Sequence, residues 1–455
     1  MTDAPATLST MSEVTPTAVG SATPVPAQSA KKRTVFAWSL WDWGSASFQA
    51  VVTTFVFSVY LTSAPFGPEA VVSAKLGTAL LIAGVVVAII APVLGRLSDS
   101  AGRRKTWLGI NTAITIACTA LLVLVAPGEQ YLLLGLVLLA VGNVAFEFAG
   151  VSYNAMLGQI SNNGNVGKIS GLGWGMGYLG GIVLLAILLV GFIFPDVGWF
   201  GVTSEAGWNI RVAMVISALW FAVFAIPVFF AVPEIPADPG APGTARGLLT
   251  AYRDLFHTIG DLWRNARQTL FFLLASAVFR DGLAGVFTFG GVIASLSFGF
   301  DPTTVIIFAI AANVIAGLAT IVVGQFEDRI GAKTVMVWSI LLMVVCGLLV
   351  FILNPMGSWV FWVFGLLLCI FVGPVQSASR SFLARLIPSG REGEIFGLYA
   401  TTGRAVSFLA PAGFTFAVGL GGTTIYGILG IVLVLLAGLL LLLPVKTGSP
   451  AVIAP

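Results

Sequence analysis

A short charged segment occurs twice in this chain, each time between two long apolar stretches, and it most strongly limits how the chain can fold. The first copy is Gly-Arg-Leu-Ser-Asp-Ser-Ala-Gly-Arg-Arg-Lys at 95–105, and the second is Gly-Gln-Phe-Glu-Asp-Arg-Ile-Gly-Ala-Lys-Thr at 324–334. Gly, Asp, Gly and a following basic residue recur at the same spacing, 229 residues further along. A repeat at about half the chain length, with apolar segments around each copy, indicates two similar membrane-embedded halves in tandem, as in transporters.

Composition supports a membrane protein. Of the 455 residues 58% are hydrophobic and only 9% are charged, and the mean hydropathy is +1.00. So few polar groups cannot cover a water-soluble surface of this size. Cys118, Cys346 and Cys369 lie in apolar runs and His257 is the single histidine, so we expect no disulfide framework, metal site or cofactor. The net charge of +3 is too small to indicate a nucleic-acid partner.

The apolar segments are long enough to count as membrane spans, which need about 20 residues each. Twelve such segments are expected, at 35–61, 74–96, 106–126, 131–156, 169–194, 209–232, 270–298, 303–326, 334–354, 358–386, 394–420 and 423–444. We therefore predict an all-α integral membrane protein of twelve transmembrane helices in two pseudo-symmetric six-helix bundles. The predicted domains are a disordered cytoplasmic tail at 1–34, bundles at 35–232 and 269–445, a linker at 233–268 and a cytoplasmic tail at 446–455.

The linker contains apolar residues at helical spacing, including Leu248, Tyr252, Leu255, Ile259 and Leu262, with charged residues between them. This pattern predicts an amphipathic helix on the cytoplasmic membrane surface. A regulatory or partner-binding helix is the alternative.

Lysine and arginine next to membrane spans mark the cytoplasmic side. If the amino terminus is inside, the cytoplasmic loops carry most of the basic residues, and the opposite side carries only Lys75 and Arg211. We therefore expect both termini in the cytoplasm.

Six charged residues fall inside the predicted spans, where each costs a few kcal/mol unless it faces a partner or water. They are Asp42, Glu147, Asp281, Arg280, Arg380 and Arg404. Asp42, Ser45, Gln49 and Thr53 share one face of the first span and predict a polar stripe along a cavity, as do Asn143, Glu147 and Asn154 in the fourth. Gln376 in the tenth span is a further candidate.

Two interpretations of these charges remain open. In the first, they form ion pairs that only close a gate. In the second, they bind a zwitterionic solute, with an arginine for its carboxylate and Asp42 or Glu147 for its ammonium group. Asp42 or Glu147 is also a candidate for binding a coupling proton.

The two charged segments resemble the signature of the major facilitator superfamily, Gly-x-x-x-Asp-x-x-Gly-Arg-Arg/Lys. Further segments resemble the vacuole-effluxer-like family within it, whose fungal members are autophagy-linked vacuolar amino-acid exporters. These are Trp-Asp-Trp-Gly-Ser-Ala at 41–46, Tyr-Asn-Ala-Met-Leu at 153–157, the glycine-rich 170–181, and Ser-Arg-Ser-Phe-Leu-Ala-Arg-Leu-Ile-Pro at 379–388.

The resemblance implies a cytoplasmic gate motif formed by Gly95, Asp99, Gly102, Arg103, Arg104, Gly324, Asp328, Arg329, Gly331 and Lys333. A carboxylate after a helix end can accept amide hydrogens at the start of a neighbouring helix. For Asp99, the resemblance places that neighbour in span eleven, which begins near Glu394.

We therefore predict a secondary active transporter that moves a small polar organic solute by alternating access, with amino-acid efflux as the leading expectation and no enzyme activity. The expected partners are the solute, a coupling proton and the lipid bilayer, and the expected functional unit is a monomer. The membrane would be the plasma membrane in a bacterium and the vacuolar membrane in a fungus. A non-transporting receptor or scaffold with the same fold, or a carrier for another solute class, is the alternative.

Overall fold

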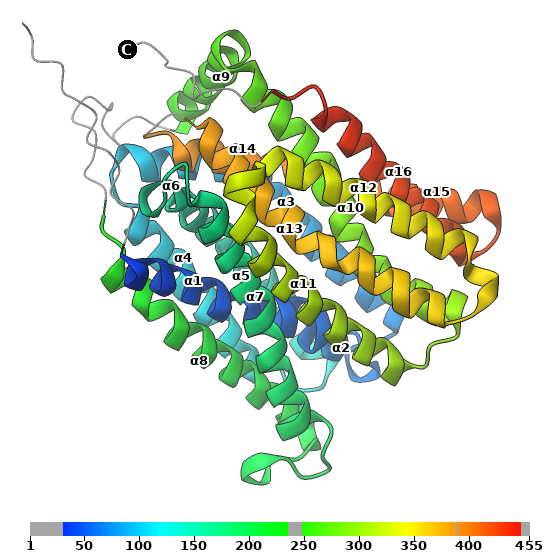
Figure 1. The fold of residues 1–455 in the computed structure, drawn as a ribbon. Coiled ribbons are helices and arrows are strands. Elements are labelled where there is room, and N and C mark those ends of the chain that lie inside the picture. Colours follow the sequence, from blue (N-terminus) through cyan, green and yellow to red (C-terminus); the bar gives the residue numbers. More distant parts are fainter. Residues whose placement is uncertain (1–30, 235–247, 388–389, 447–455) are drawn as a thin grey trace, which may run out of the picture.

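The computed structural model describes residues 31–234, 248–387 and 390–446, and these are almost entirely helical (Figure 1). Twelve helices in these ranges are long and apolar enough to cross a membrane. Each matches one predicted segment, so the prediction of an all-α membrane protein with twelve spans is confirmed. Most of the two predicted tails lies outside the described residues.

The first six spans form the N-terminal half. Because lipid offers the backbone no hydrogen bonds, long apolar segments satisfy their own amides as helices. Span one consists of α1 (Lys32–Ser47), the π-helix η1 (Phe48–Phe55) and α2 (Phe57–Leu61). The remaining helices are α3 (Glu69–Ser100), α4 (Arg104–Leu121), α5 (Glu129–Ala155), the short α6 (Leu157–Ile160), α7 (Val166–Leu188) and α8 (Trp208–Ala231).

The other six spans form the C-terminal half. They are α10 (Arg267–Phe298), α11 (Pro302–Ile330), α12 (Ala332–Ile352), the π-helix η8 (Phe361–Gly365) with α13 (Leu366–Leu386), the interrupted pair α14 (Glu392–Ala405) and α15 (Leu409–Gly421), and α16 (Gly427–Leu442). Asp301 starts α11, because its carboxylate accepts from the Thr304 hydroxyl and from the amide of Thr303 at 3.1 Å. The hydrogen bond from the Thr304 hydroxyl, followed by those from the backbone amides, lowers the pKa of Asp301.

The linker helix is α9 (Leu248–Asn265), which lies outside the bundle at the top of Figure 1. Leu255 and Leu262 are buried. The Tyr252 hydroxyl donates to the carbonyl of Ile89 on α3 at 3.0 Å, and Arg391 donates to the Thr258 hydroxyl at 2.8 Å. The amphipathic helix of the linker is therefore docked on protein, and it contacts both halves.

The two halves meet along two lines of contact. The first seam is the contact of α3 with α14, and the second seam is the contact of α7 with α11. Glycines allow the helices to approach closely: a Cβ on Gly95 would overlap the carbonyl of Gly393, and a Cβ on Gly171 would lie 2.9 Å from the Cα of Gly324. The repeated glycines at 95 and 324 thus take equivalent places in the two seams.

Proline shapes two of the spans. Pro92 has no amide hydrogen, so the Ala88 carbonyl lacks its helical donor, and the Thr401 hydroxyl donates to it across the first seam at 2.9 Å. In span eleven the helix is interrupted between α14 and α15, and Pro411 follows in the first turn of α15. A proline there clashes with the carbonyl four residues earlier, which explains the break.

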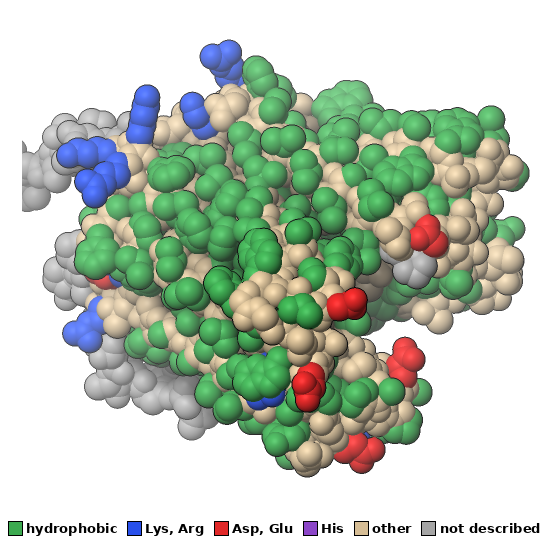
Figure 2. Space-filling view, turned by 90° about the horizontal axis from the view of Figure 1, so that it is seen from below, with side chains coloured by type: hydrophobic (Ala, Val, Ile, Leu, Met, Phe, Trp, Pro, Cys, Tyr) green, Lys and Arg blue, Asp and Glu red, His purple; other side chains and the backbone are tan. Residues whose placement is uncertain are grey.

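One end of the molecule carries both charged loops and is called the motif end below. In the space-filling view of Figure 2, lysine and arginine side chains gather toward one end of the visible face and most of the visible aspartate and glutamate lies toward the other. A broad hydrophobic surface separates them, as expected for a protein surrounded by lipid.

Candidate functional site

Asp99 lies at the centre of the first seam. Its Oδ2 accepts the amide of Glu394 in the first turn of α14 at 3.0 Å, and its Oδ1 accepts Arg104 Nε at 2.8 Å. Arg104 is buried and also binds Glu392 of the opposite half at 2.6 Å. The contact predicted between Asp99 and the start of span eleven is therefore present.

Asp328 occupies the equivalent place in the second seam. Its two carboxylate oxygens accept the amides of Gly167 at 2.8 Å and Lys168 at 3.0 Å, which open α7. Arg385 of α13 pairs with Asp328 at 2.7 Å and with the buried Glu327 at 3.4 Å. Each repeated aspartate thus binds a helix amino terminus of the opposite half, where the helix dipole favours negative charge.

The basic residues of the motif have different roles. Arg103 and Arg329 are exposed, whereas Lys333 donates to the carbonyl of Leu443 at 2.7 Å, at the end of α16. Lys105 does the same at the end of α8, donating to the carbonyls of Phe229 and Val232 at 2.9 Å. Gly102 and Gly331 have φ of 59° and 93°, so both turns need glycine.

Deeper in the bundle, Arg380 of α13 reaches into the N-terminal half. It pairs with Asp42 at 3.4 Å and donates to Asn154 Oδ1 at 3.2 Å, to Ser170 Oγ at 3.0 Å and to the Ser170 carbonyl at 2.8 Å. The Arg380 side chain is only 3% exposed and Asp42 is 18% exposed. Because each of its three nitrogens has an acceptor, Arg380 has little capacity left for a solute.

Aromatic rings surround this pair. The Arg380 guanidinium lies 5.0 Å from the ring centre of Trp38, 5.7 Å from Tyr153 and 5.5 Å from Trp174. Tyr153 stacks on Trp38 with ring centres 4.4 Å apart and donates its hydroxyl to Asp42 at 2.9 Å. We call Asp42 and Arg380 the buried pair. Cation–π contact with these rings, together with the hydrogen bonds of Arg380, favours a fixed geometry of the pair.

Glu147 of α5 and Arg404 of α14 form a second ion pair between the halves. Their side chains are 24% and 32% exposed, respectively, although both lie within membrane spans. We call them the exposed pair. A partly exposed ion pair inside a span indicates a water-accessible cavity.

Arg280 and Asp281 are adjacent on α10 but have separate contacts at the interrupted span. Arg280 donates to the carbonyl of Tyr399 at 3.1 Å and lies 3.8 Å from the centre of its ring. Asp281 accepts the amide of Ala410 at 2.6 Å, in the first turn of α15. The two neighbours therefore bind the two halves of the broken helix.

The other predicted polar residues are more dispersed. Gln376 accepts the Tyr178 hydroxyl at 2.8 Å across the halves, Gln49 is exposed, and Asn143 is half-buried. The predicted stripe on span one is not continuous, because the π-helix from Phe48 changes the side-chain phase and Ser45 is buried.

Several residues of these networks did not stand out in the sequence. Glu327, Arg385, Glu392 and Tyr399 are examples. Glu327 precedes the repeated aspartate, and Arg385 belongs to the segment at 379–388. Their spacing along the chain does not show which partner in the other half each one meets.

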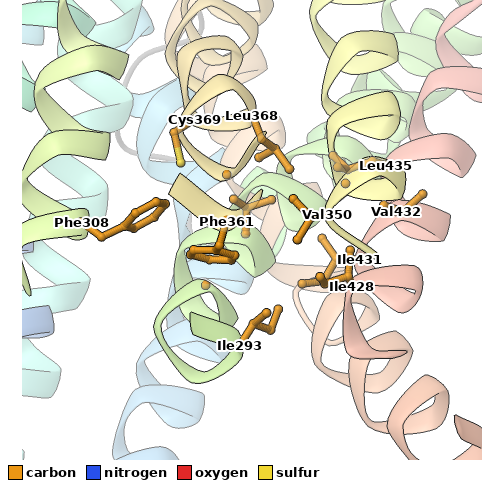
Figure 3. Close-up of a pocket in the computed structure, with 14 residues that line it drawn as sticks. Ile293, Phe308, Val350, Phe361, Leu368, Cys369, Ile428, Ile431, Val432 and Leu435 are labelled. Carbon is orange, nitrogen blue, oxygen red and sulfur yellow. The ribbon is translucent and has the colours of Figure 1, made fainter. Parts of the chain in front are cut away.

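A cavity of about 60 Å³ lies inside the C-terminal half (Figure 3). Its walls are apolar and include Phe308, Val350, Phe361 and Ile431. A polar solute would find no hydrogen-bonding partner there, so this cavity does not fit the expected solute. Among the described residues, no group of three histidines, cysteines or acids is placed to hold a metal ion.

Two family models match this chain. The family model described as vacuole effluxer Atg22 like matches residues 163–450, and the Major Facilitator Superfamily model matches 5–185. The chain belongs to the vacuole effluxer Atg22-like family. It is a transporter of the major facilitator type, as the resemblance in its motifs implied.

Individual relatives are distant. An uncharacterised MFS-type transporter of Bacillus subtilis, YxiO, is 27% identical over 423 residues, which cover 90% of this chain and 95% of that protein. Autophagy-related protein 22-1 of Aspergillus niger is 28% identical over 263 residues, covering 54% of this chain and 41% of the fungal protein. The chain thus matches less than half of that fungal relative.

Solved structures share the fold at low identity. The proton:xylose symporter XylE superposes with a TM-score of 0.68 at 12% identity, covering 91% of this chain and 94% of that one. A bacterial homologue of the iron transporter ferroportin in an outward-facing state gives 0.66 at 13% identity, covering 90% and 98%. These similarities show the fold of a major facilitator transporter.

Proposed function

We propose that this chain is a secondary active carrier for a small zwitterionic organic solute, with amino acids as the leading candidates and export as the leading direction. Its motif end faces the cytoplasm, together with both termini, which the basic residues at that end support. One chain supplies both halves of the site, which supports a monomer as the functional unit.

Contacts at the motif end support an outward-facing state. Asp99 and Asp328 hold both seams together there, yet the exposed pair remains partly accessible. Water and solute would therefore reach Glu147 and Arg404 from the opposite end, as alternating access requires when the cytoplasmic side is closed.

The exposed pair carries the proposal, because each half contributes one charge of opposite sign. A zwitterion can place its carboxylate on Arg404 and its ammonium group on Glu147, so one ion pair is replaced by two and no charge is left unpaired. Arg280 of α10 contacts the same interrupted span, because it donates to the carbonyl of Tyr399. The buried pair fits this role less well because its arginine is already occupied.

Counterflow in proteoliposomes tests the proposal. A panel of amino acids and other polar solutes is first screened for thermal stabilisation of the purified protein, and the best one is then exchanged across the vesicle membrane. Arg404→Gln should abolish counterflow, whereas Lys75→Gln, an exposed change on α3, should leave it at the parent level. Absence of counterflow for every stabilising solute would favour a receptor or scaffold instead.

A further inference from the structure

Asp42, Glu147 and Asp281 lie in the interior of their spans, away from the span ends, and Asp281 differs from the other two. Asp42 has Arg380 and Glu147 has Arg404 at ion-pair distance. Asp281, by contrast, has no arginine or lysine within ion-pair distance among the described residues, and it is 7% exposed. The adjacent Arg280 points its guanidinium at Tyr399 instead.

We propose that Asp281 is the site at which a coupling proton binds. This inference rests on the proposed function, since it names the coupling ion and its place. Adding a proton to Asp42 or Glu147 would leave a buried or half-buried arginine without its counter-charge, which is strongly unfavourable. Adding one to Asp281 leaves no cation unpaired, because its carboxylate is held by the Ala410 amide and the amino terminus of α15.

Among the side chains that the structure describes, no other charge compensates Asp281 from the elements packed against α10. Helices α15 and α16 have no titratable side chain. On α14 and α13 the charged groups already have partners: Glu392 binds Arg104, Glu394 binds Arg391, Arg404 binds Glu147, Arg380 binds Asp42 and Arg385 binds Asp328. The other titratable groups on the elements packed against α10 are as follows. Tyr399 is on α14, Cys369 is on α13, Tyr426 precedes α16, and Glu327, Asp328 and Arg329 lie at the motif end of α11. Helix α9 carries Tyr252, Arg253, Asp254, His257, Asp261 and Arg264.

The position of Asp281 explains how a proton would act on the conformation. The ionised carboxylate binds the first turn of α15 to α10 just after the break in span eleven. When a proton joins the carboxylate, the negative charge that attracts this helix end is lost. The outer segment α15, which has little buried surface, is then free to move over the water-accessible cavity at the exposed pair, while α14 stays in the first seam.

The test compares driven accumulation with exchange in the same vesicles. In the parent, a pH gradient should drive accumulation of the solute. Asp281→Asn keeps the acceptor for Ala410 but cannot titrate, so accumulation should fall to the level without a gradient while counterflow continues, since exchange needs no net proton movement. Asp301→Asn is the matched control: it is the same substitution at another helix start, outside the cavity, and both activities should match the parent.

Accumulation at the parent level in Asp281→Asn would overturn the proposal, as would accumulation driven by sodium and not by pH. The sodium-driven result would leave the proposed function standing, whereas counterflow without any gradient-driven accumulation in the parent would overturn both the coupling proposal and the active character of the proposed transport. No counterflow in the parent would instead count against the proposed function.

A second measurement uses only the parent protein, in case the variant does not fold. Dicyclohexylcarbodiimide reacts with protonated carboxyl groups in apolar surroundings, and the adduct is located by mass spectrometry. We expect the adduct on Asp281, decreasing as pH rises. An adduct on Glu147 or Asp42 with none on Asp281 would contradict the proposal even if transport were never observed.

Discussion

The two seams have the same plan but different surroundings. Each has an aspartate from the repeated motif on a helix amino terminus of the other half, and each has glycines that allow close contact. Next to the second seam lies the buried pair, with Arg380 enclosed by aromatic rings. Beside the first seam lie the exposed pair and the interrupted span eleven.

This difference suggests a division of roles between related interfaces. The buried pair beside the second seam is enclosed and its arginine is hydrogen-bonded through all three nitrogens, so it serves best as a fixed contact that holds one conformation. The exposed pair beside the first seam is partly accessible to solvent and its Arg404 lies on a broken helix, so a ligand or a proton can act there.

The largest effect is expected at the buried pair. Asp42→Asn leaves the Arg380 charge buried and unpaired, which should destabilise the protein by about 3–5 kcal/mol. Glu147→Gln should cost less, because Arg404 is 32% exposed and water can solvate it. Thermal unfolding of both variants in detergent measures the difference. Equal losses of stability would remove the distinction between the two pairs.

The glycines of the seams come next. A Cβ on Gly95 or Gly171 meets backbone of the other half, so Gly95→Ala and Gly171→Ala should each cost about 1–3 kcal/mol in the state with a closed motif end. Cysteine labelling at that end should increase in both variants. Gly150→Ala is the control, since its Cβ would have no neighbour within 4 Å. Unchanged labelling in both seam variants would show that the contact is not this close.

A smaller effect is expected from the repeated aspartates. Asp99→Asn and Asp328→Asn keep the shape but lose the attraction to a helix amino terminus, worth about 0.3–2 kcal/mol. Asp328 accepts two amides and Asp99 accepts one, so Asp328→Asn should open the motif end further. Labelling of cysteines placed along each seam measures this. A larger increase in labelling for Asp99→Asn than for Asp328→Asn would show that the first seam depends more on its aspartate than the second.

Some features of the two seams can be predicted from the sequence. The twelve spans followed from apolar length, and the contact of Asp99 with span eleven followed from the resemblance and from the chemistry of helix ends. The identity of the ion pairs did not follow, because Asp42 and Arg380 are 338 positions apart and only packing of the two halves brings them together. The faces on which the polar side chains of span one lie were also not predicted, because hydropathy does not show where a π-helix begins.

The smallest effect concerns the hydrogen bond that Pro92 makes necessary in the first seam. Thr401→Val removes the hydroxyl that donates to the Ala88 carbonyl, and it should cost about 0.5–1.5 kcal/mol. Pro92→Ala restores an amide at position 92, which can donate to the same carbonyl within α3. In the Pro92→Ala background, Thr401→Val should therefore cost clearly less, so the two changes are coupled. Stability of the parent, both single variants and the double variant gives this coupling directly. Additive costs would mean that Thr401 acts by packing alone, and that the first seam has no hydrogen bond that depends on its proline.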